Sequence, residues 1–154
     1  MMKLGLLTAI LPDMTFEEVV DYASEVGYGA LEVCCWPKGK AVRRYAGVTH
    51  IDVDTLTREK AAYYVDYAKK KNIEIAALAY FPNPLSDDAE TAKVARNHIK
   101  KVIKAAALMQ VPVVTTFIGK NKTLTVEENL KQMKKVWPAI LKVAEDSGVR
   151  VAIE

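Results

Sequence analysis

The stretch VRVAIE, residues 149–154, decides how the rest of the chain is interpreted. It is a short, largely apolar run that ends on the carboxylate of Glu154. A strand of this kind is buried on both faces when it belongs to a parallel sheet covered by helices. Glu154 would then lie at the carboxyl end of a strand, where parallel α/β folds place their chemistry. The alternative is a strand end that presents its glutamate to water.

Composition narrows the class of protein before any motif is considered. The 154 residues are 51% hydrophobic and 27% charged, with a formal net charge of +3. Such a chain suits one globular domain, residues 1–154, and carries no signature of nucleic-acid or membrane binding. It shows no signal peptide, so we expect a cytoplasmic protein. Cys34 and Cys35 are adjacent and would point to opposite faces of a strand, as small core residues rather than a disulfide.

Apolar runs and helical patterns alternate along the chain. We expect strands near residues 3–10, 30–36, 74–81, 111–118 and 149–154, and helices near 16–26, 56–71, 87–109 and 126–147. Thr15 with Glu18, and Thr125 with Glu128, have the spacing of capping boxes at helix starts. Pro138 predicts a kink within the last helix. The order predicts (βα)4 plus a fifth strand in a parallel sheet.

Two folds compete for this pattern. A doubly wound open sheet of five strands would be complete at this length, whereas a (βα)8 barrel would be cut roughly in half. The open sheet usually binds nucleotides, but the first strand is not followed by a glycine-rich loop. The sequence also lacks a GxxxxGK[ST] loop, a GxSxG elbow and an HExxH helix.

Five stretches, taken together and in order, carry a resemblance to a known family. They are GYGALEV at 27–33 with Trp36-Pro37, YAGVTHIDVD at 45–54, ALAYFPNPL at 77–85, VVTTFIG at 113–119, and VAIE at 151–154. The chain resembles the sugar phosphate isomerase/epimerase family, the xylose isomerase-like TIM barrels. The resemblance runs along the whole chain but covers only the first half of a family member. It implies a partial (βα)8 TIM barrel.

The resemblance also implies a role for Glu154. In this family a glutamate at the end of the fifth strand is the first metal ligand, and in the epimerases it is one of two carboxylates that move a proton beside the sugar carbonyl. The other ligands are an Asp, a His and a second Glu from later strands, which this sequence does not contain. The implied cofactor is a divalent metal (Mn, Mg, Co or Zn) that needs those further ligands. We therefore expect the chain by itself to be inactive.

Substrate-binding candidates lie at or beyond the expected strand ends. They are Trp36, Tyr80, Asn83 and Phe117, which a barrel would aim at its mouth, although each could instead pack at the rim. His50, with Arg43, lies in the long loop 38–54 and could contact a sugar or phosphate, or remain a solvated loop residue.

Two further residues have ambiguous positions. Glu32 lies inside an apolar strand, where its charge requires a partner. It could form a hydrogen bond within the barrel mouth or face outward. His98 falls in the middle of a helix, where we expect a surface or capping role.

Three functions remain open. The first is a metal-dependent isomerase or epimerase acting on a sugar or sugar phosphate through an enediolate, with this chain as its N-terminal part. The second is a half-barrel that forms a homodimer, or pairs with a complementing C-terminal half, as a binding module. The third is a metal-dependent lyase or endonuclease-like barrel relative.

Overall fold

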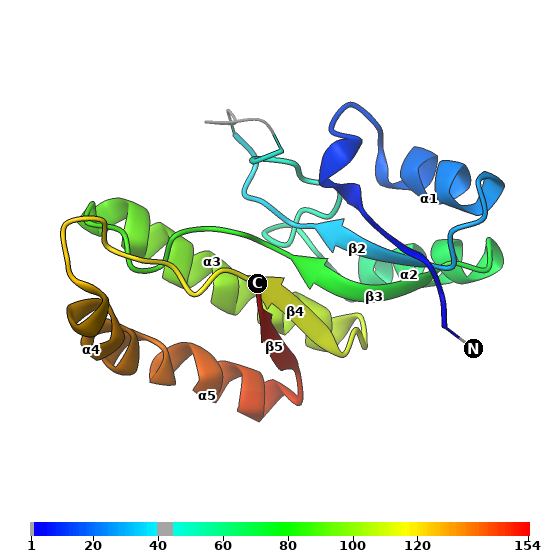
Figure 1. Cartoon of the computed structure of the whole chain (residues 1–154). Coiled ribbons are helices and arrows are strands. Elements are labelled where there is room, and N and C mark those ends of the chain that lie inside the picture. Colours follow the sequence, from blue (N-terminus) through cyan, green and yellow to red (C-terminus); the bar gives the residue numbers. More distant parts are fainter. Residues whose placement is uncertain (1, 40–44) are drawn as a thin grey trace.

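A single five-stranded sheet organises the protein (Figure 1). The computed structural model describes residues 2–39 and 45–154. The strands are β1 (Gly5–Leu7), β2 (Ala30–Cys34), β3 (Glu74–Ala79), β4 (Val113–Thr116) and β5 (Arg150–Ile153). Every pair is parallel, and the order is β1-β2-β3-β4-β5. A doubly wound sheet reverses its strand order, whereas a barrel does not. The fold is therefore a partial TIM barrel, (βα)4 plus a fifth strand, as predicted.

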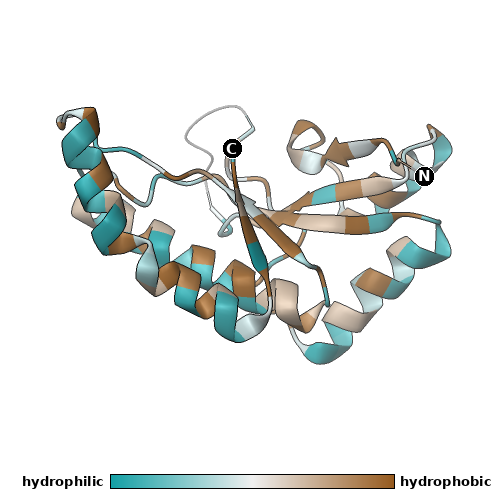
Figure 2. Cartoon of the chain, turned by 60° about the horizontal axis from the view of Figure 1, so that its bottom comes forward, coloured by the Kyte–Doolittle hydropathy of each residue, from teal (hydrophilic) through white to brown (hydrophobic). Residues whose placement is uncertain are grey.

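The helices pack side by side on one side of this sheet (Figure 2). They are α1 (Phe16–Glu25), α2 (Arg58–Lys70), α3 (Ala89–Leu108), α4 (Val126–Val136) and α5 (Pro138–Ser147). Right-handed crossovers between parallel strands place successive helices on the same face of a sequentially ordered sheet. The main apolar core fills the space between the two layers, with Leu31, Leu78 and Val114 from the strands against Ile99 and Ile140 from the helices. None of these helices, in the described part of the chain, is long and apolar enough to cross a membrane.

Local sequence signals account for most helix ends. Thr15 with Glu18, and Thr125 with Glu128, form the two predicted capping boxes. The expected kink at Pro138 is instead a break between two helices. Pro138 is the first residue of α5 and has no backbone N–H to donate to the preceding turn. Trp137 lies at the junction, and its indole Nε1 donates to the carbonyl of Ile118 at 3.1 Å, which anchors the break on the loop after β4.

The first strand is shorter than expected. Residues 3–10 were predicted as a strand, but β1 ends at Leu7 and the 3-10 helix η1 (Thr8–Ile10) follows. The backbone N–H of Cys34 on β2 donates to the Thr8 hydroxyl at 2.9 Å. The Thr8 hydroxyl thus takes the place of the backbone carbonyl that a continuing strand would offer to Cys34. The main chain can therefore leave the sheet after Leu7.

The face of the sheet turned away from the helices is called the inner face here. It carries Leu7, Glu32, Cys34, Ala77, Ala79, Thr115 and Ala152. A second buried cluster lies at the carboxyl end of this face, where Cys34 and Ala79 pack with Phe81. Cys35, the neighbour of Cys34, belongs to the core under the helices, so the two thiols do point to opposite faces.

Candidate functional site

Glu154 directly follows β5 at the carboxyl end of the sheet, as expected from the sequence. Its backbone N–H donates to the carbonyl of Thr116 at 3.1 Å, which continues the β4–β5 pairing. By strand alternation its side chain lies on the same face as Ala152. An open depression of about 450 Å³ surrounds it, lined by Pro82, Asn83, Phe117, Ile118, Gly119, Lys120 and Glu154. The loops after β3 and β4 therefore contribute to one site with the end of β5.

Glu32 supplies a second carboxylate on the inner face. It pairs in register with Leu7 on one side and Ala77 on the other, and accepts a hydrogen bond from the Thr115 hydroxyl on β4. Burial raises the pKa of the Glu32 carboxyl; the hydrogen bond from Thr115 opposes this rise, and the negative charge of Glu154 adds to it. The two carboxylates therefore belong to one electrostatic site.

Asn83 joins the two loops beside Glu154. Its amide Nδ2 donates to the carbonyl of Lys120 at 2.8 Å, while its Oδ1 accepts from the backbone N–H groups of Lys120 at 2.9 Å and Leu85 at 3.2 Å. These bonds occupy both ends of the predicted substrate-binding amide. In this structure Asn83 holds the wall of the depression in place.

Phe117 is the predicted aromatic residue that lines the depression. Its ring lies 4.9 Å from the ring of Phe81, with an interplanar angle of 41°. Phe81 was not among the sequence candidates, although Tyr80 next to it was. Ala77 and Ala79 on β3 are small residues at every second position, and Phe81 continues this alternation. This is the sequence signal that could have identified Phe81 as the aromatic residue on the inner face.

Tyr80 lies on the helix side of the sheet rather than in the depression. It is only 3% exposed, and burial raises the pKa of its hydroxyl to about 12. Its ring makes edge contacts with Trp36 at 4.9 Å and with His98 at 4.7 Å. Trp36 is half-buried and contacts both apolar clusters, and its Nε1 has no hydrogen-bond partner among the described residues.

His98 corrects an expectation from the sequence. It was predicted to take a surface or capping role, but it is 4% exposed and its Nε2 lies 2.8 Å from the carbonyl oxygen of Cys35. Helix α3 crosses the end of β2 at this point, so a histidine in the middle of the helix meets a free strand carbonyl. The apolar pattern of α3 does not reveal such a partner.

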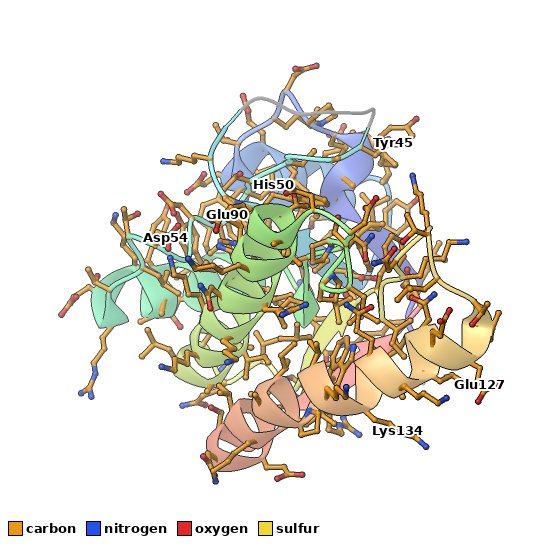
Figure 3. The ribbon with its side chains drawn as sticks, turned by 90° about the vertical axis from the view of Figure 1, so that its left-hand side faces the viewer. Tyr45, His50, Asp54, Glu90, Glu127 and Lys134 are labelled. Atoms are coloured by element: carbon orange, nitrogen blue, oxygen red, sulfur yellow. The ribbon has the colours of Figure 1, made fainter. Side chains whose placement is uncertain are left out.

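His50 is also held within the protein. It is 8% exposed, with Nδ1 at 2.9 Å from the Thr8 hydroxyl and Nε2 at 3.1 Å from the carbonyl oxygen of Leu11. In Figure 3 it lies lower in the view than Tyr45, which precedes it on the same loop. Arg43, the other loop candidate, lies outside the described residues.

The described residues do not form a complete metal site. Among residues 2–39 and 45–154, no three His, Cys, Asp or Glu side chains are grouped closely enough to hold a metal ion. Glu154 and Glu32 offer carboxylate oxygens, which suit hard divalent cations, but two carboxylates fall short of the usual ligand number.

The sequential parallel sheet and the carboxylate after its fifth strand define a protein of the (βα)8 barrel class. The chain belongs to the xylose isomerase-like TIM barrel family, whose sequence profile matches residues 20–154. The resemblance inferred from the sequence is thereby confirmed.

Comparison with individual proteins shows that the chain spans only part of its relatives. It is 28% identical to the uncharacterized protein YfiH of Bacillus subtilis (strain 168) over 120 residues, which are 77% of this chain and 36% of YfiH. It also superimposes on larger solved barrels and covers about half of each.

Three such structures share the fold at low sequence identity. They are the probable 3-DHS dehydratase AsbF of Bacillus anthracis (TM-score 0.71, 16% identity, 99% of this chain and 52% of that chain), the D-psicose 3-epimerase of Clostridium cellulolyticum H10 with D-tagatose (0.69, 15%, 99% and 52%), and the IolI protein with a zinc atom (0.68, 17%, 99% and 51%). The family and these neighbours include sugar epimerases and a metal-binding protein.

Proposed function

We propose that this chain is the N-terminal part of a metal-dependent isomerase or epimerase that acts on a sugar or sugar phosphate. The observation that carries the proposal is the position of Glu154, at the carboxyl end of β5 in an open depression beside Phe117. The epimerase among the structural neighbours supports the reaction class, and the zinc atom in IolI supports the metal. The remaining metal ligands would come from the half of the barrel that this chain does not contain.

The residues of the chain fit proton transfer beside a carbonyl. A proton on such a carbon is weakly acidic, and its removal by a carboxylate leaves a negatively charged enediolate. In this proposal Glu154 is the carboxylate that takes and returns this proton. A divalent cation bound there would stabilise the developing charge on the substrate oxygens. Phe117 would cover one side of the substrate, and the Asn83 contacts keep that wall rigid.

The proposal predicts that Glu154→Gln, in the protein as its source cells make it, loses both turnover and metal. Loss of a general base costs about 10²- to 10⁴-fold in rate. We would measure bound metal by mass spectrometry and turnover against a panel of free and phosphorylated sugars. Glu127→Gln is the matched control, because Glu127 is a well-exposed residue of α4 (Figure 3). Unchanged metal content and rate in Glu154→Gln would contradict the assignment.

A lyase is the second candidate function. The fold neighbour AsbF is a probable dehydratase, and elimination can begin with the same removal of a proton beside a carbonyl. The two reactions differ in their products, because elimination releases water and leaves a double bond, whereas isomerisation keeps every atom. Product analysis by NMR in the same panel separates them. A protein that binds sugars without converting them would instead be a binding module.

A further inference from the structure

Glu32 is a partly buried carboxylate that has only one hydrogen bond and no ion pair in the described structure to offset its loss of hydration. It is half-buried on the inner face, where its charged form is poorly solvated. Its one hydrogen bond comes from Thr115 to Oε1, and none of the ion pairs among the described residues includes it. A partly buried carboxylate that also senses the charge of a candidate catalytic group is a functional-site candidate.

The space beside Glu32 is lined by small side chains. Barrel interiors are normally filled by layers of bulky branched residues. Here Ala77 and Ala79 on β3 lie between Glu32 and Thr115, and Ala152 pairs with Thr115 on the other side. Glu32 can therefore extend across β3 to reach Thr115. Its second oxygen, Oε2, has no partner among the described residues and is not sealed from solvent.

We propose that Glu32, oriented by Thr115, accepts a hydrogen bond from a substrate hydroxyl at the inner end of the site, and so selects substrates whose inner end is not phosphorylated. The proposal rests on the proposed function and narrows its substrate class to free polyhydroxy compounds at that end. A hydroxyl group can donate to Oε2 and relieve its incomplete solvation. A phosphate in the same place would bring further negative charge beside Glu32 and Glu154.

Thr115 acts as a positioning residue in this arrangement. Its hydroxyl donates to Oε1, which leaves Oε2 of Glu32 free to accept another hydrogen bond. Thr115→Val keeps the shape of the side chain but removes the donor, whereas Thr115→Ser keeps the donor. Comparing these two variants therefore shows whether Thr115 acts by orienting Glu32 or only by packing on β4.

The test uses ligands that cannot be turned over. Xylitol and sorbitol, each free and as the terminal phosphate, are titrated by calorimetry into the metal-loaded protein as its source cells make it. We expect the free polyols to bind the wild type more tightly than their phosphates. Glu32→Gln replaces a charged acceptor by a neutral one. It should weaken binding of the free polyol roughly 10-fold and reduce the discrimination against phosphate by at least about 10-fold. Metal content should not change.

The companion variants should follow the same logic. Thr115→Val should weaken polyol binding about 3- to 10-fold, Thr115→Ser should restore it, and Glu127→Gln should leave it unchanged. The inference would be overturned if the phosphates bound the wild type as tightly as the free polyols. It would also be overturned if Glu32→Gln kept the wild-type preference for free polyol over phosphate. A wild-type protein that binds no polyol, although its turnover depends on Glu154, would overturn the inference as well. Metal binding and rate that survive Glu154→Gln would overturn the proposed function itself.

Discussion

Thr8 is a fully buried hydroxyl that joins three segments of the chain. It accepts the backbone N–H of Cys34 at 2.9 Å, so its own proton is free to be donated to Nδ1 of His50, also at 2.9 Å. The His50 Nε2–H then donates to the carbonyl of Leu11 at 3.1 Å. The carbonyl of Leu11 can only accept, so this bond places a proton on Nε2, and burial, which lowers the pKa of His50, favours the neutral imidazole. His50 thus ties the second βα loop to the first one, next to the site.

At the residue scale we predict that the two histidines make stability depend on pH. Burial lowers the pKa of both His50 and His98 below the ordinary value of 6.5. The unfolded chain therefore binds more protons than the folded chain as the pH falls below 6.5, and folding stability is lost in that range. It is fully present above 6.5.

Urea unfolding between pH 7.5 and pH 5 measures this effect. His50→Gln and His98→Gln should each reduce the loss of unfolding free energy on acidification, and the double variant should reduce it most. Other groups titrate equally in all four proteins, so the differences isolate the histidines. Identical pH slopes in wild type and double variant would contradict the prediction.

At the element scale, the loop after β4 depends on a glycine. Gly119 has a positive φ of 79°, and a Cβ there would lie 2.6 Å from Asn83 Oδ1 and 2.7 Å from Pro84 Cδ. The loop after β3 thus approaches the loop after β4 more closely than any side chain permits. Gly148, at the C-terminus of α5, also has a positive φ of 65° but has no atoms within 4 Å of such a Cβ.

We therefore predict that Gly119→Ala destabilises the protein more than Gly148→Ala. Left-handed backbone strain costs about 1–2 kcal/mol in both variants. The crowding around residue 119 adds about 1–3 kcal/mol and separates the two loops. Thermal and urea unfolding measure the difference in free energy, and Gly148→Ala is the control for strain alone. Equal destabilisation by the two substitutions would show that the loops do not need this contact.

At the scale of the whole molecule, the sheet has two open edges. β1 and β5 are the first and last strands in the sheet order, and each has a neighbour on one side only. Apolar side chains lie at both ends, with Leu4 69% and Ile153 47% exposed. Unpaired strands with exposed apolar residues favour association with further strands. The chain also spans only about half the length of the barrels that it resembles.

We accordingly expect the protein purified from its source cells to have an intact mass near twice the 17.1 kDa of this sequence. Further strands would then lie between β5 and β1 and supply the remaining metal ligands. Native and denaturing mass spectrometry measure the assembly and the single chain. A single chain of 17.1 kDa would contradict the expectation, and a native dimer of it would favour pairing of two half-barrels.

Much of the fold follows from local patterns, because helix and strand formation depend on neighbouring residues. The apolar periodicities predicted all five strands, and the capping boxes at Thr15 and Thr125 located two helix starts. The choice between Tyr80 and Phe81 was different. The β2–β3 register shifts between Leu31 and Glu32, so that β3 carries an extra residue and the sides of its later residues are exchanged. Such a bulge arises from strand pairing and is not itself marked in the sequence; only the alternation of the small Ala77 and Ala79 with larger neighbours indicates which side the later residues take.

The order of strands and helices, the family, and the place of Glu154 after a strand could all be inferred from the sequence, because each depends on short-range pattern and motif. The alternation of strands and helices did not separate a barrel from a doubly wound sheet; the family resemblance implied the barrel, and the strand order β1-β2-β3-β4-β5 shows it. Both folds share the same alternation of elements and differ in which distant strands pair. Only the tertiary structure decided the contact between Glu32 and Thr115, which are 83 residues apart and meet only because β3 places small side chains between them.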